Sequence, residues 1–401
     1  MLPVDKKMLK FSVPTNLQDD LLDGINTEFI EEFYGVLDKD IIGGGRATVL
    51  TPGVSKKKFA AHVKSIHDMG IEFNYLLNAT CLGNYEWSGK FQKRLNKRLE
   101  WISKLGIKRV TVSIPYLLEL IKKRFSHLEV TVSTMAETDS LRRAKFWQDL
   151  GADCITLSVH GPNRDFPLLR LLKKELDIKL RLIANTQCIP QCPAPYYHSN
   201  LSAHASQGFH PSKGFMIDYA SLSCRRRRLE DPTEFIKVNF IRPEDLKYYQ
   251  EIGIDMIKFL SRGSESKFIK KVVDAYSKRS YSGNFLDLTT EASANIALKS
   301  WFKKIKYFFK PGRVNIFEFI KGKDVFCDTK IYIDNDCLEG FIEHFLDFDC
   351  QAVDCKECGY CKKYAEKCLK LSPQLRKKAL TRLNSFLDKL SSGKMFKYFG
   401  K

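Results

Sequence analysis

The chain has 401 residues, of which 44% are hydrophobic, so it can bury one large core and carry a smaller appended domain. Its first residues, MLPVDKKMLKFSVP, lack the continuous apolar segment of a secretory signal peptide. No stretch approaches the roughly 18 apolar residues that span a bilayer as a helix. We therefore expect a cytoplasmic protein without a membrane span.

The 66 basic and 47 acidic side chains give the chain a formal charge of +19. A positive field of this size favours acidic small molecules or polyanions such as RNA as partners. A lysine-rich genome would produce the same composition without such a partner. The composition alone leaves both interpretations open.

Short β-like segments alternate with amphipathic helical segments from about Met8 to Tyr276. The predicted strands are Leu9–Val13, Phe29–Tyr34, Glu72–Leu77, Arg109–Ser113, Glu129–Ser133, Cys154–Ser158, Lys179–Ala184, Lys237–Ile241 and Met256–Leu260. The predicted helices are Ser55–Met69, Phe91–Leu105, Pro115–Arg124, Ser140–Leu150, Asp165–Leu176, Pro243–Glu251 and Ser264–Arg279. Repeated strand–helix units imply parallel strands covered by helices, so residues 1–280 predict an α/β fold of the TIM-like (β/α)8 barrel type.

A long segment rich in Pro, Tyr, His, Ser and Cys interrupts this alternation between about residues 186 and 234. It directly follows a predicted strand, so we expect this insertion at the C-terminal face of the barrel, where barrel enzymes place their active sites. Long loops in compact domains are usually functional or disordered. The aromatic and cysteine content of this one argues against disorder.

Residues 281–401 follow a different pattern and predict a small cysteine-rich C-terminal domain. Its segments are a turn at Ser282–Leu288, a basic and aromatic stretch at Trp301–Arg313, a strand-rich stretch at Phe317–Asp336 and a helix at Leu338–Phe348. An amphipathic helix begins at Ser372 and Pro373, which suit an N-cap and a first helical position. Its apolar stripe favours docking on a core over a membrane or partner helix. The stripe consists of Leu375, Ala379, Leu383, Phe386, Leu387 and Leu390.

Four cysteines of this domain, here called the tail quartet, have the spacing C-xxxx-C-xx-C-xx-C. They are Cys350, Cys355, Cys358 and Cys361. In an unexported protein, clustered cysteines predict metal ligands rather than disulfides. Two-residue gaps let thiolates converge on one centre, which favours an iron–sulfur cluster, with zinc as the alternative. Cys368 is a substitute ligand, whereas Cys154, Cys327 and Cys337 are expected to be small buried hydrophobes.

Three more cysteines lie in the insertion. Cys188 and Cys192 form a CxxxC pair, and Cys224 follows further along. Together they predict a metal site at the active-site face, where a fourth ligand must come from elsewhere or one position stays open to substrate. Cys81 follows a predicted strand on the same face and is our prediction for that ligand, because Cys154 begins a strand and would lie at the wrong end.

Several short phrases resemble the peptidase U32 family of collagenase-like proteins, over roughly residues 8–280. They are Gly44–Ala47, Asn74–Thr80, Val132–Met135, Ile241–Leu246, Ile257–Gly263 and Val273–Tyr276, in this order along the chain. The resemblance implies a TIM-like barrel that carries a 4Fe–4S cluster on four cysteines. Cys188, Cys192 and Cys224 lie where the family places its ligands, although their spacing departs from the commonest family pattern.

The resemblance also implies an activity. Family members are linked to oxygen-independent hydroxylation of RNA bases or of ubiquinone precursors, with prephenate as the oxygen donor in some, rather than to proteolysis. The tail quartet lies outside the common core. It indicates a divergent subgroup in which a second cluster is an open alternative to zinc.

Four further side chains are candidates for catalysis or substrate binding. Lys258 and Arg262 lie near the end of a predicted barrel strand, where they can bind a carboxylate or form a salt bridge that closes the barrel. His198 and His204 lie in the insertion, as acid–base groups, as ligands or as structural residues. His160, just past another predicted strand, has the same alternatives.

Other motifs are less informative. Arg225–Arg228 directly follows Cys224 and can bind phosphate or remain a solvated charge run. Gly43–Arg46 lacks the Gly-Lys-Ser/Thr of a P-loop and predicts a tight turn. The chain contains no HExxH and no GxSxG motif, so a peptidase has no recognisable machinery here.

The sequence thus predicts an iron–sulfur enzyme of the U32 type that acts on RNA or an acidic small molecule. One alternative is a non-catalytic electron-transfer or scaffold subunit that serves a homologous protein partner. A peptidase is the other.

Overall fold

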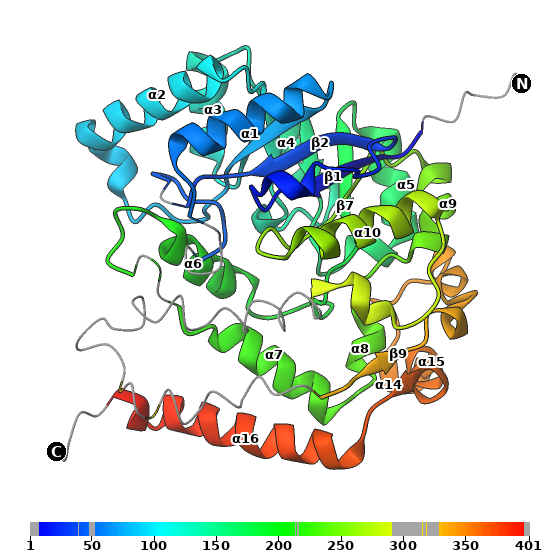
Figure 1. The fold of residues 1–401 in the computed structure, drawn as a ribbon. Helices are drawn as coiled ribbons and strands as arrows, with labels where there is room; N and C mark the ends of the chain where they lie inside the picture. Colours follow the sequence, from blue (N-terminus) through cyan, green and yellow to red (C-terminus); the bar gives the residue numbers. More distant parts are fainter. Residues whose placement is uncertain are drawn as a thin grey trace, which may run out of the picture.

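The computed structural model describes residues 8–38, 40–47, 53–212, 214, 216–290, 315, 318 and 329–396. Figure 1 shows a set of parallel strands surrounded by helices, with the C-terminal helix running along one side of the molecule. The predicted stretch Trp301–Arg313, most of Phe317–Asp336 and Cys327 lie outside the described residues.

Eight parallel strands close into a barrel in the order in which they occur along the chain. They are β1 (Lys10–Pro14), β2 (Ile30–Gly35), β3 (Glu72–Leu77), β4 (Arg109–Val112), β5 (Glu129–Val132), β6 (Cys154–Thr156), β7 (Lys179–Ile183) and β8 (Met256–Lys258). The register of β1 on β8, with Ser12 opposite Lys258, closes the ring. The TIM-like barrel expected from the sequence is confirmed.

Helices follow the strands at the positions predicted from the sequence. They are α1 (Lys56–Asp68), α2 (Gly89–Lys104), α3 (Pro115–Arg124), α4 (Leu141–Asp149), α5 (Phe166–Glu175), α9 (Leu246–Ile252) and α10 (Ser266–Lys278). Ser55 and Ser88 cap α1 and α2 by accepting hydrogen bonds from backbone N–H groups of the first turn. Each helix buries its apolar stripe against the barrel, which explains why periodicity located these helices.

The predicted strand Lys237–Ile241 is wrong. The short helix α8 (Glu234–Lys237) occupies its beginning, and the N–H of Ile241 donates to the carbonyl of Ala184 outside the strand ladder. Val238 and Phe240 are buried. Their apolar pattern therefore reflects packing beside the barrel, which a short apolar run cannot distinguish from a strand.

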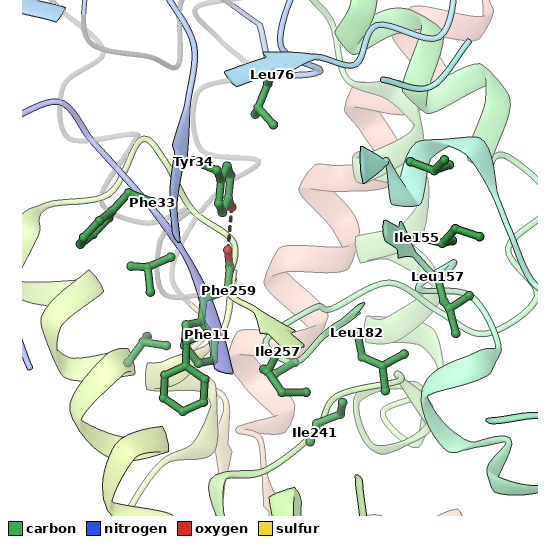
Figure 2. Close-up of a cluster of buried hydrophobic side chains, with 14 of the residues drawn as sticks. Phe11, Phe33, Tyr34, Leu76, Ile155, Leu157, Leu182, Ile241, Ile257 and Phe259 are labelled. Atoms are coloured by element: carbon green, nitrogen blue, oxygen red, sulfur yellow. Dashed lines mark hydrogen bonds between the residues drawn. The ribbon is translucent and has the colours of Figure 1, made fainter. Parts of the chain in front are cut away.

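Aromatic and aliphatic side chains join the first strand to the last (Figure 2). The rings of Phe11 and Phe259 lie with their centroids 5.1 Å apart, and the Tyr34 hydroxyl donates to the carbonyl oxygen of Phe259 at 2.6 Å. Leu182 and Ile257 are register neighbours on β7 and β8. These contacts fix the segment after β8, which carries candidate site residues.

The insertion forms two helices, α6 (Pro195–Ser206) and α7 (Tyr219–Glu230), before α8. The C-terminal part consists of η7 (Phe285–Leu288), β9 (Tyr332–Ile333), η10 (Asp336–Leu338), η11 (Phe341–Leu346), α14 (Cys355–Cys358), α15 (Tyr360–Cys368), β10 (Leu369–Lys370), α16 (Pro373–Ser391) and η12 (Lys394–Phe396). The predicted helix at Leu338–Phe348 is therefore made of 3-10 turns, and β9 pairs antiparallel with β10.

The last long helix, α16, lies along α7 (Figure 1). It buries Ala379, Leu383, Phe386 and Leu387, as its apolar stripe predicted. Arg376 donates to the carbonyls of the last two residues of α7 at 2.6 Å each. None of the helices in the described part of the chain combines the length and apolarity that a membrane span needs.

We expect Leu383→Ala to lower the free energy of unfolding of the C-terminal part by about 2–5 kcal/mol, because Leu383 is fully buried where α16 packs. The exposed Lys378 on the same helix is the matched control. Lys378→Ala should change the free energy of unfolding by less than about 0.5 kcal/mol. Urea denaturation followed by hydrogen exchange of α16 measures both. Equal effects of the two substitutions would show that α16 is not docked.

Candidate active site

The interior of the barrel is polar. Each of the eight strands contributes one buried polar side chain, namely Ser12, Glu32, Asn74, Thr111, Thr131, Thr156, Arg181 and Lys258. The Ser12 hydroxyl donates to Glu32 at 2.6 Å, the Thr111 hydroxyl donates to Asn74 at 2.7 Å, and the Asn74 amide donates to Glu32 at 3.2 Å. Barrels of this type are usually filled by branched aliphatic side chains, so this polar network is a departure that indicates function.

An ion pair between Glu32 and Arg181 lies within this network. Nη2 of Arg181 is 2.9 Å from Oε1 of Glu32, and both side chains are buried. Burial would raise the pKa of Glu32, but the charge of Arg181 and the hydrogen bond from Ser12 outweigh it and hold the pKa below its ordinary value. Nε and Nη1 of Arg181 have no hydrogen-bond partner among the described residues.

Cations gather at the C-terminal mouth of the barrel. Nζ of Lys258 lies 3.6 Å from the centroid of the Tyr34 ring, and burial together with Arg181 holds its pKa well below the ordinary value. Arg262 donates to the carbonyl of Gly44, and burial lowers its pKa to about 10. Within the described residues, neither Lys258 nor Arg262 has a carboxylate at ion-pair distance, so a barrel-closing salt bridge finds no partner here.

The glycine-rich turn after β2 passes directly over this mouth. A Cβ at Gly44 would lie 3.0 Å from Nη1 of Arg262, and a Cβ at Gly45 would lie 2.6 Å from Sδ of Met135. Gly45 also has a φ of +61°, which side chains rarely allow. The predicted tight turn is present, and it carries Arg46 to within electrostatic reach of Tyr34.

The insertion begins beside the mouth. Asn185 accepts a hydrogen bond from the N–H of Leu260 at 2.7 Å and donates to the carbonyl of Leu288 at 3.1 Å. These bonds tie the residue after β7 to the segment after β8. The cysteine-bearing loop therefore starts at the same face as Lys258 and Arg262.

The structure brings the three insertion cysteines together. Loss of contact with water raises the pKa of the Cys188 thiol to about 11, and the nearby Cys224 and Cys192 contribute in the same direction. The N–H of Ala194 points at Sγ of Cys192 at 3.5 Å. Arg228 also lies within electrostatic reach of Cys188, where it opposes the rise.

Cys81 has different neighbours. Its sulfur accepts a hydrogen bond from the N–H of Gly83 at 3.4 Å, and its carbonyl accepts one from Gln207 at 2.6 Å. Its role as fourth ligand stays a prediction. Across the described residues, no three His, Cys, Asp or Glu side chains are arranged to hold a metal ion. The donors fit the 4Fe–4S cluster by their chemistry, because three neighbouring thiols lie beside a cation that can offset thiolate charge.

The arginines of α7 support the insertion. Arg228 is buried, donates to the side chain of Gln187 at 3.1 Å and lies 5.1 Å from the centroid of the Phe235 ring. Arg226 pairs with Glu230 of α7, and Arg227 pairs with Glu234 of α8. The arginines of this segment therefore contact other side chains of the protein, unlike those of a solvated charge run.

His198, Asp218 and Ser221 form a cluster between α6 and α7. Nε2 of His198 lies 3.1 Å from Oδ2 of Asp218, and the Ser221 hydroxyl donates to the same oxygen at 2.6 Å. The Ser221 hydroxyl also lies 3.4 Å from Nε2 of His198, so this one ring nitrogen faces both the serine and the acid, whereas in a hydrolytic triad the two ring nitrogens serve them separately. Asp218 caps α7 by accepting a hydrogen bond from the N–H of Ser221. His204 stacks on His210 with centroids 4.2 Å apart. Both predicted histidines thus have structural contacts.

His160, a candidate from the sequence, forms a pair at the mouth with the buried Glu137, which was not evident from the sequence. Oε2 of Glu137 accepts a hydrogen bond from Ser158 at 2.6 Å, and its Oε1 lies 3.7 Å from Nε2 of His160. Burial raises the pKa of Glu137 above its ordinary value. Nδ1 of His160 lies 3.1 Å from the carbonyl oxygen of Ile189, between Cys188 and Cys192. The position of Glu137 after a barrel strand is the signal that could have identified it.

The tail quartet lies in and around α14 and α15. The other three thiols of the quartet all act electrostatically on Cys350. Gly359, with a φ of 62°, reverses the chain between Cys358 and Cys361. Nε2 of His344 lies 3.9 Å from Sγ of Cys358.

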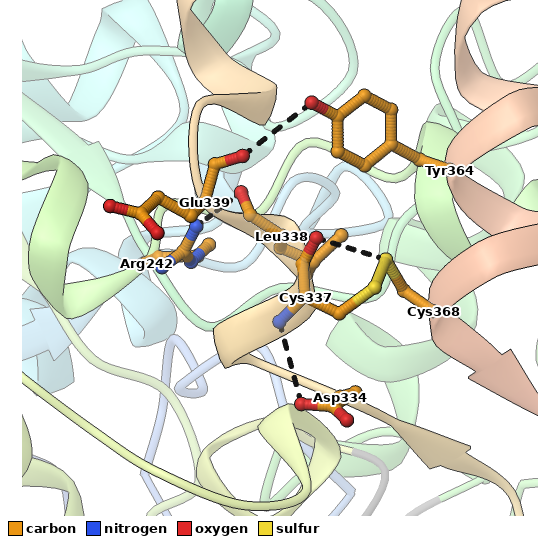
Figure 3. Close-up of a disulfide and its surroundings, with 7 residues drawn as sticks. All are labelled: Arg242, Asp334, Cys337, Leu338, Glu339, Tyr364 and Cys368. Atoms are coloured by element: carbon orange, nitrogen blue, oxygen red, sulfur yellow. Dashed lines mark hydrogen bonds between the residues drawn. A yellow bond between two sulfur atoms is a disulfide. The ribbon is translucent and has the colours of Figure 1, made fainter.

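Two other tail cysteines correct an expectation. Cys337 and Cys368 form a disulfide, with Cα atoms 5.5 Å apart (Figure 3). Cys337 is therefore not a plain buried hydrophobe, and Cys368 is not a spare metal ligand. Disulfide pairing cannot be deduced from spacing. Disulfides persist in oxidising compartments and in hyperthermophiles. The cytoplasmic location stays a prediction that this pair does not support.

Comparison with known proteins adds the following. Residues 46–317 match the model of peptidase family U32. An uncharacterized protease of Methanocaldococcus jannaschii is 29% identical over 347 residues, which are 86% of this chain and 91% of that protein. The solved structure of a U32 peptidase is similar at 20% identity and a TM-score of 0.49, over 65% of this chain and 96% of that one. A δ-aminolevulinic acid dehydratase from Toxoplasma gondii is similar at 11% identity and a TM-score of 0.37, over 69% and 90%.

We expect Arg181→Met to lower the free energy of unfolding by about 3–5 kcal/mol, because it leaves the Glu32 carboxylate buried without its counterion. The exposed pair Lys64–Asp68 supplies the control, and Lys64→Met should cost at most about 0.5 kcal/mol. Urea denaturation at pH 7 measures both.

The pH dependence has a definite sign. Since the folded pKa of Glu32 lies below the ordinary value of 4.5, its stabilisation is complete above that value and is lost as the pH falls through the folded pKa. A stability of Arg181→Met equal to that of the unmodified chain would contradict the ion pair.

Proposed function

Because the chain belongs to the peptidase U32 family, we propose that it is an iron–sulfur enzyme that hydroxylates or otherwise redox-modifies an anionic substrate held at the mouth of its barrel. The observation that carries the proposal is the placement of Lys258 and Arg262, without described carboxylate partners, at the face that bears the insertion cysteines. The family resemblance supplies the reaction class.

Cys188, Cys192 and Cys224 are the proposed ligands of a 4Fe–4S cluster, with Cys81 as the fourth in the same proposal. A fully ligated cluster transfers electrons, and one with an open iron acts as a Lewis acid. His160 holds the carbonyl between Cys188 and Cys192, so it positions the ligand loop.

The cations at the mouth have distinct roles in substrate binding. The planar guanidinium of Arg262 binds a carboxylate through two parallel hydrogen bonds. Lys258 has a depressed pKa, and a bound anion would raise that pKa again, so Nζ can take up a proton as substrate enters and release it as product leaves. Glu137, whose pKa is raised, is a second group that can move a proton at this face.

Exposed aromatic side chains favour RNA as one substrate class. Tyr85 and Trp87 follow β3, with 45% and 66% of their surface exposed, and Tyr196 and Tyr197 on α6 are 54% and 52% exposed. Bases of single-stranded RNA stack on such rings, while an acidic small molecule needs only the cations. Both substrate classes remain within the proposal.

The two alternatives are as untested as the main proposal. For a peptidase, the cluster of His198, Asp218 and Ser221 lacks the geometry of a hydrolytic triad, because the same ring nitrogen of His198 faces both the acid and the serine. A non-catalytic subunit that serves a homologous partner would copurify with that partner and show no turnover alone.

We expect Cys188→Ser and Cys192→Ser to remove the iron and sulfide that anaerobically purified protein carries at the barrel, together with the visible absorbance of the cluster. Cys154→Ser is the control, because Cys154 lies in β6, away from the insertion. Its iron content should equal that of the unmodified chain. Absence of iron from every variant and from the unmodified protein would overturn the proposal.

Prephenate is the probe for the mouth, because it carries two carboxylates. Arg262→Ala should weaken prephenate binding by about 10-fold or more, since a charge-assisted hydrogen bond contributes about 1.5–3 kcal/mol. Arg142→Ala, on the exposed face of α4, is the matched control. Calorimetry measures both affinities.

A single-stranded RNA oligonucleotide separates the substrate classes. Binding that falls steeply with salt and weakens in Trp87→Ala assigns the mouth to RNA. If neither prephenate nor RNA bound at the mouth, that result would contradict the proposal of an anionic substrate.

A further inference from the structure

Arg164, in η5 (Pro162–Arg164), is a buried cation without a described carboxylate partner. Only 6% of its surface is exposed. Nη1 donates to the carbonyl of Ile236 at 2.9 Å, whereas Nε and Nη2 have no hydrogen-bond partner among the described residues. A buried guanidinium destabilises the fold unless negative charge or hydrogen bonds offset its loss of hydration.

Aromatic rings account for part of this environment. The guanidinium lies 4.4 Å from the centroid of the Phe240 ring, 4.8 Å from that of Phe341 and 5.2 Å from that of Phe345. Cation–π contacts offset part of the cost of burying such a cation. They leave the unpartnered N–H groups unexplained.

Four ionisable side chains act electrostatically on Arg164. Two are tail-quartet thiols, Cys361 and Cys350, and the others are Tyr249 and the Asp245 carboxylate, which is not at ion-pair distance. The helix α15 packs on α8, and Lys237 of α8 acts on Cys355 and Cys361. Nη1 of Arg164 also donates to the carbonyl of Lys237 at 3.3 Å, so both cations lie near the quartet.

Neutral thiols cannot balance a cation, but metal-bound thiolates can. A tetrathiolate zinc site and a 4Fe–4S cluster on four cysteines both carry a net negative charge. We propose that the tail quartet binds one metal centre as four thiolates and that the Arg164 guanidinium neutralises part of its charge across the contact between barrel and tail. This centre is separate from the barrel cluster of the proposed function.

Two neighbours complete the site. His344, stacked on Tyr360 with centroids 4.0 Å apart, reaches Sγ of Cys358 from Nε2 and can donate a hydrogen bond to a thiolate. The left-handed Gly359 allows the reversal that brings Cys361 back toward Cys358. The quartet is not preformed in coordination geometry, so metal binding draws the four sulfurs together.

The test uses the full chain with Cys188→Ser and Cys192→Ser, so that metal at the barrel does not obscure the tail. Anaerobic preparations of this variant should contain about one zinc or about four irons per chain. Adding Cys361→Ser should remove that metal, and adding Cys154→Ser should not. A background variant without either metal, or metal that survives Cys361→Ser and Cys358→Ser, would overturn the site.

The role of Arg164 is tested in the same background. Arg164→Met keeps the length of the side chain but not its charge, and should weaken metal retention against a chelator by about 10- to 100-fold. Arg164→Lys, which keeps the charge, should weaken metal retention less than Arg164→Met does. Lys237→Gln is the second variant, which leaves the barrel interior intact and should give a smaller loss in the same direction. If Arg164→Met folds and holds metal as tightly as Arg164→Lys, the aromatic rings alone explain Arg164 and the charge-balance inference is wrong.

Discussion

The ion pair between Glu32 and Arg181 determines how charge is distributed in the barrel. Removing two charges from water costs several kcal/mol each, which their attraction and the hydrogen bonds from Ser12 and Asn74 offset. Glu32 forms its ion pair with Arg181. Lys258, two register positions nearer the mouth, makes a cation–π contact with the ring of Tyr34 instead. Glu32 still acts electrostatically on Lys258, but among the described residues no carboxylate lies at ion-pair distance from Lys258 or Arg262.

The same arrangement recurs at both groups of clustered cysteines. Arg228 lies within electrostatic reach of Cys188 in the insertion, and Arg164 stands in the same relation to Cys361 in the tail. Both arginines are buried against aromatic rings. A cation beside a thiol lowers the cost of forming a thiolate there. The fold thus provides both sites with positive charge from residues that are distant in sequence from most of the cysteines.

Periodicity predicted the barrel because its helices and strands bury regular apolar faces, as in α10 with Phe268, Val272 and Tyr276. The same reasoning failed at Lys237–Ile241, whose buried apolar side chains pack beside the sheet. Spacing selected the clustered cysteines as candidate ligands, and strand ends selected Lys258 and Arg262 as candidate substrate-binding residues; these roles stay predictions. Arg164 and Glu137 were not identified, because their burial and partners arise only when segments far apart in the chain meet. Pairing of Cys337 with Cys368 was missed for the same reason.

The disulfide between Cys337 and Cys368 makes a covalent ring that contains the whole tail quartet, since its two ends are 31 residues apart and Cys350–Cys361 lies between them. In the metal centre proposed for the tail, this bond would withhold two sulfurs from the incoming metal. Reduction would release them, and six thiols would then compete for four coordination positions. The cross-link would therefore act as a selector of ligands, which keeps the metal on one set of sulfurs and away from mixed sets.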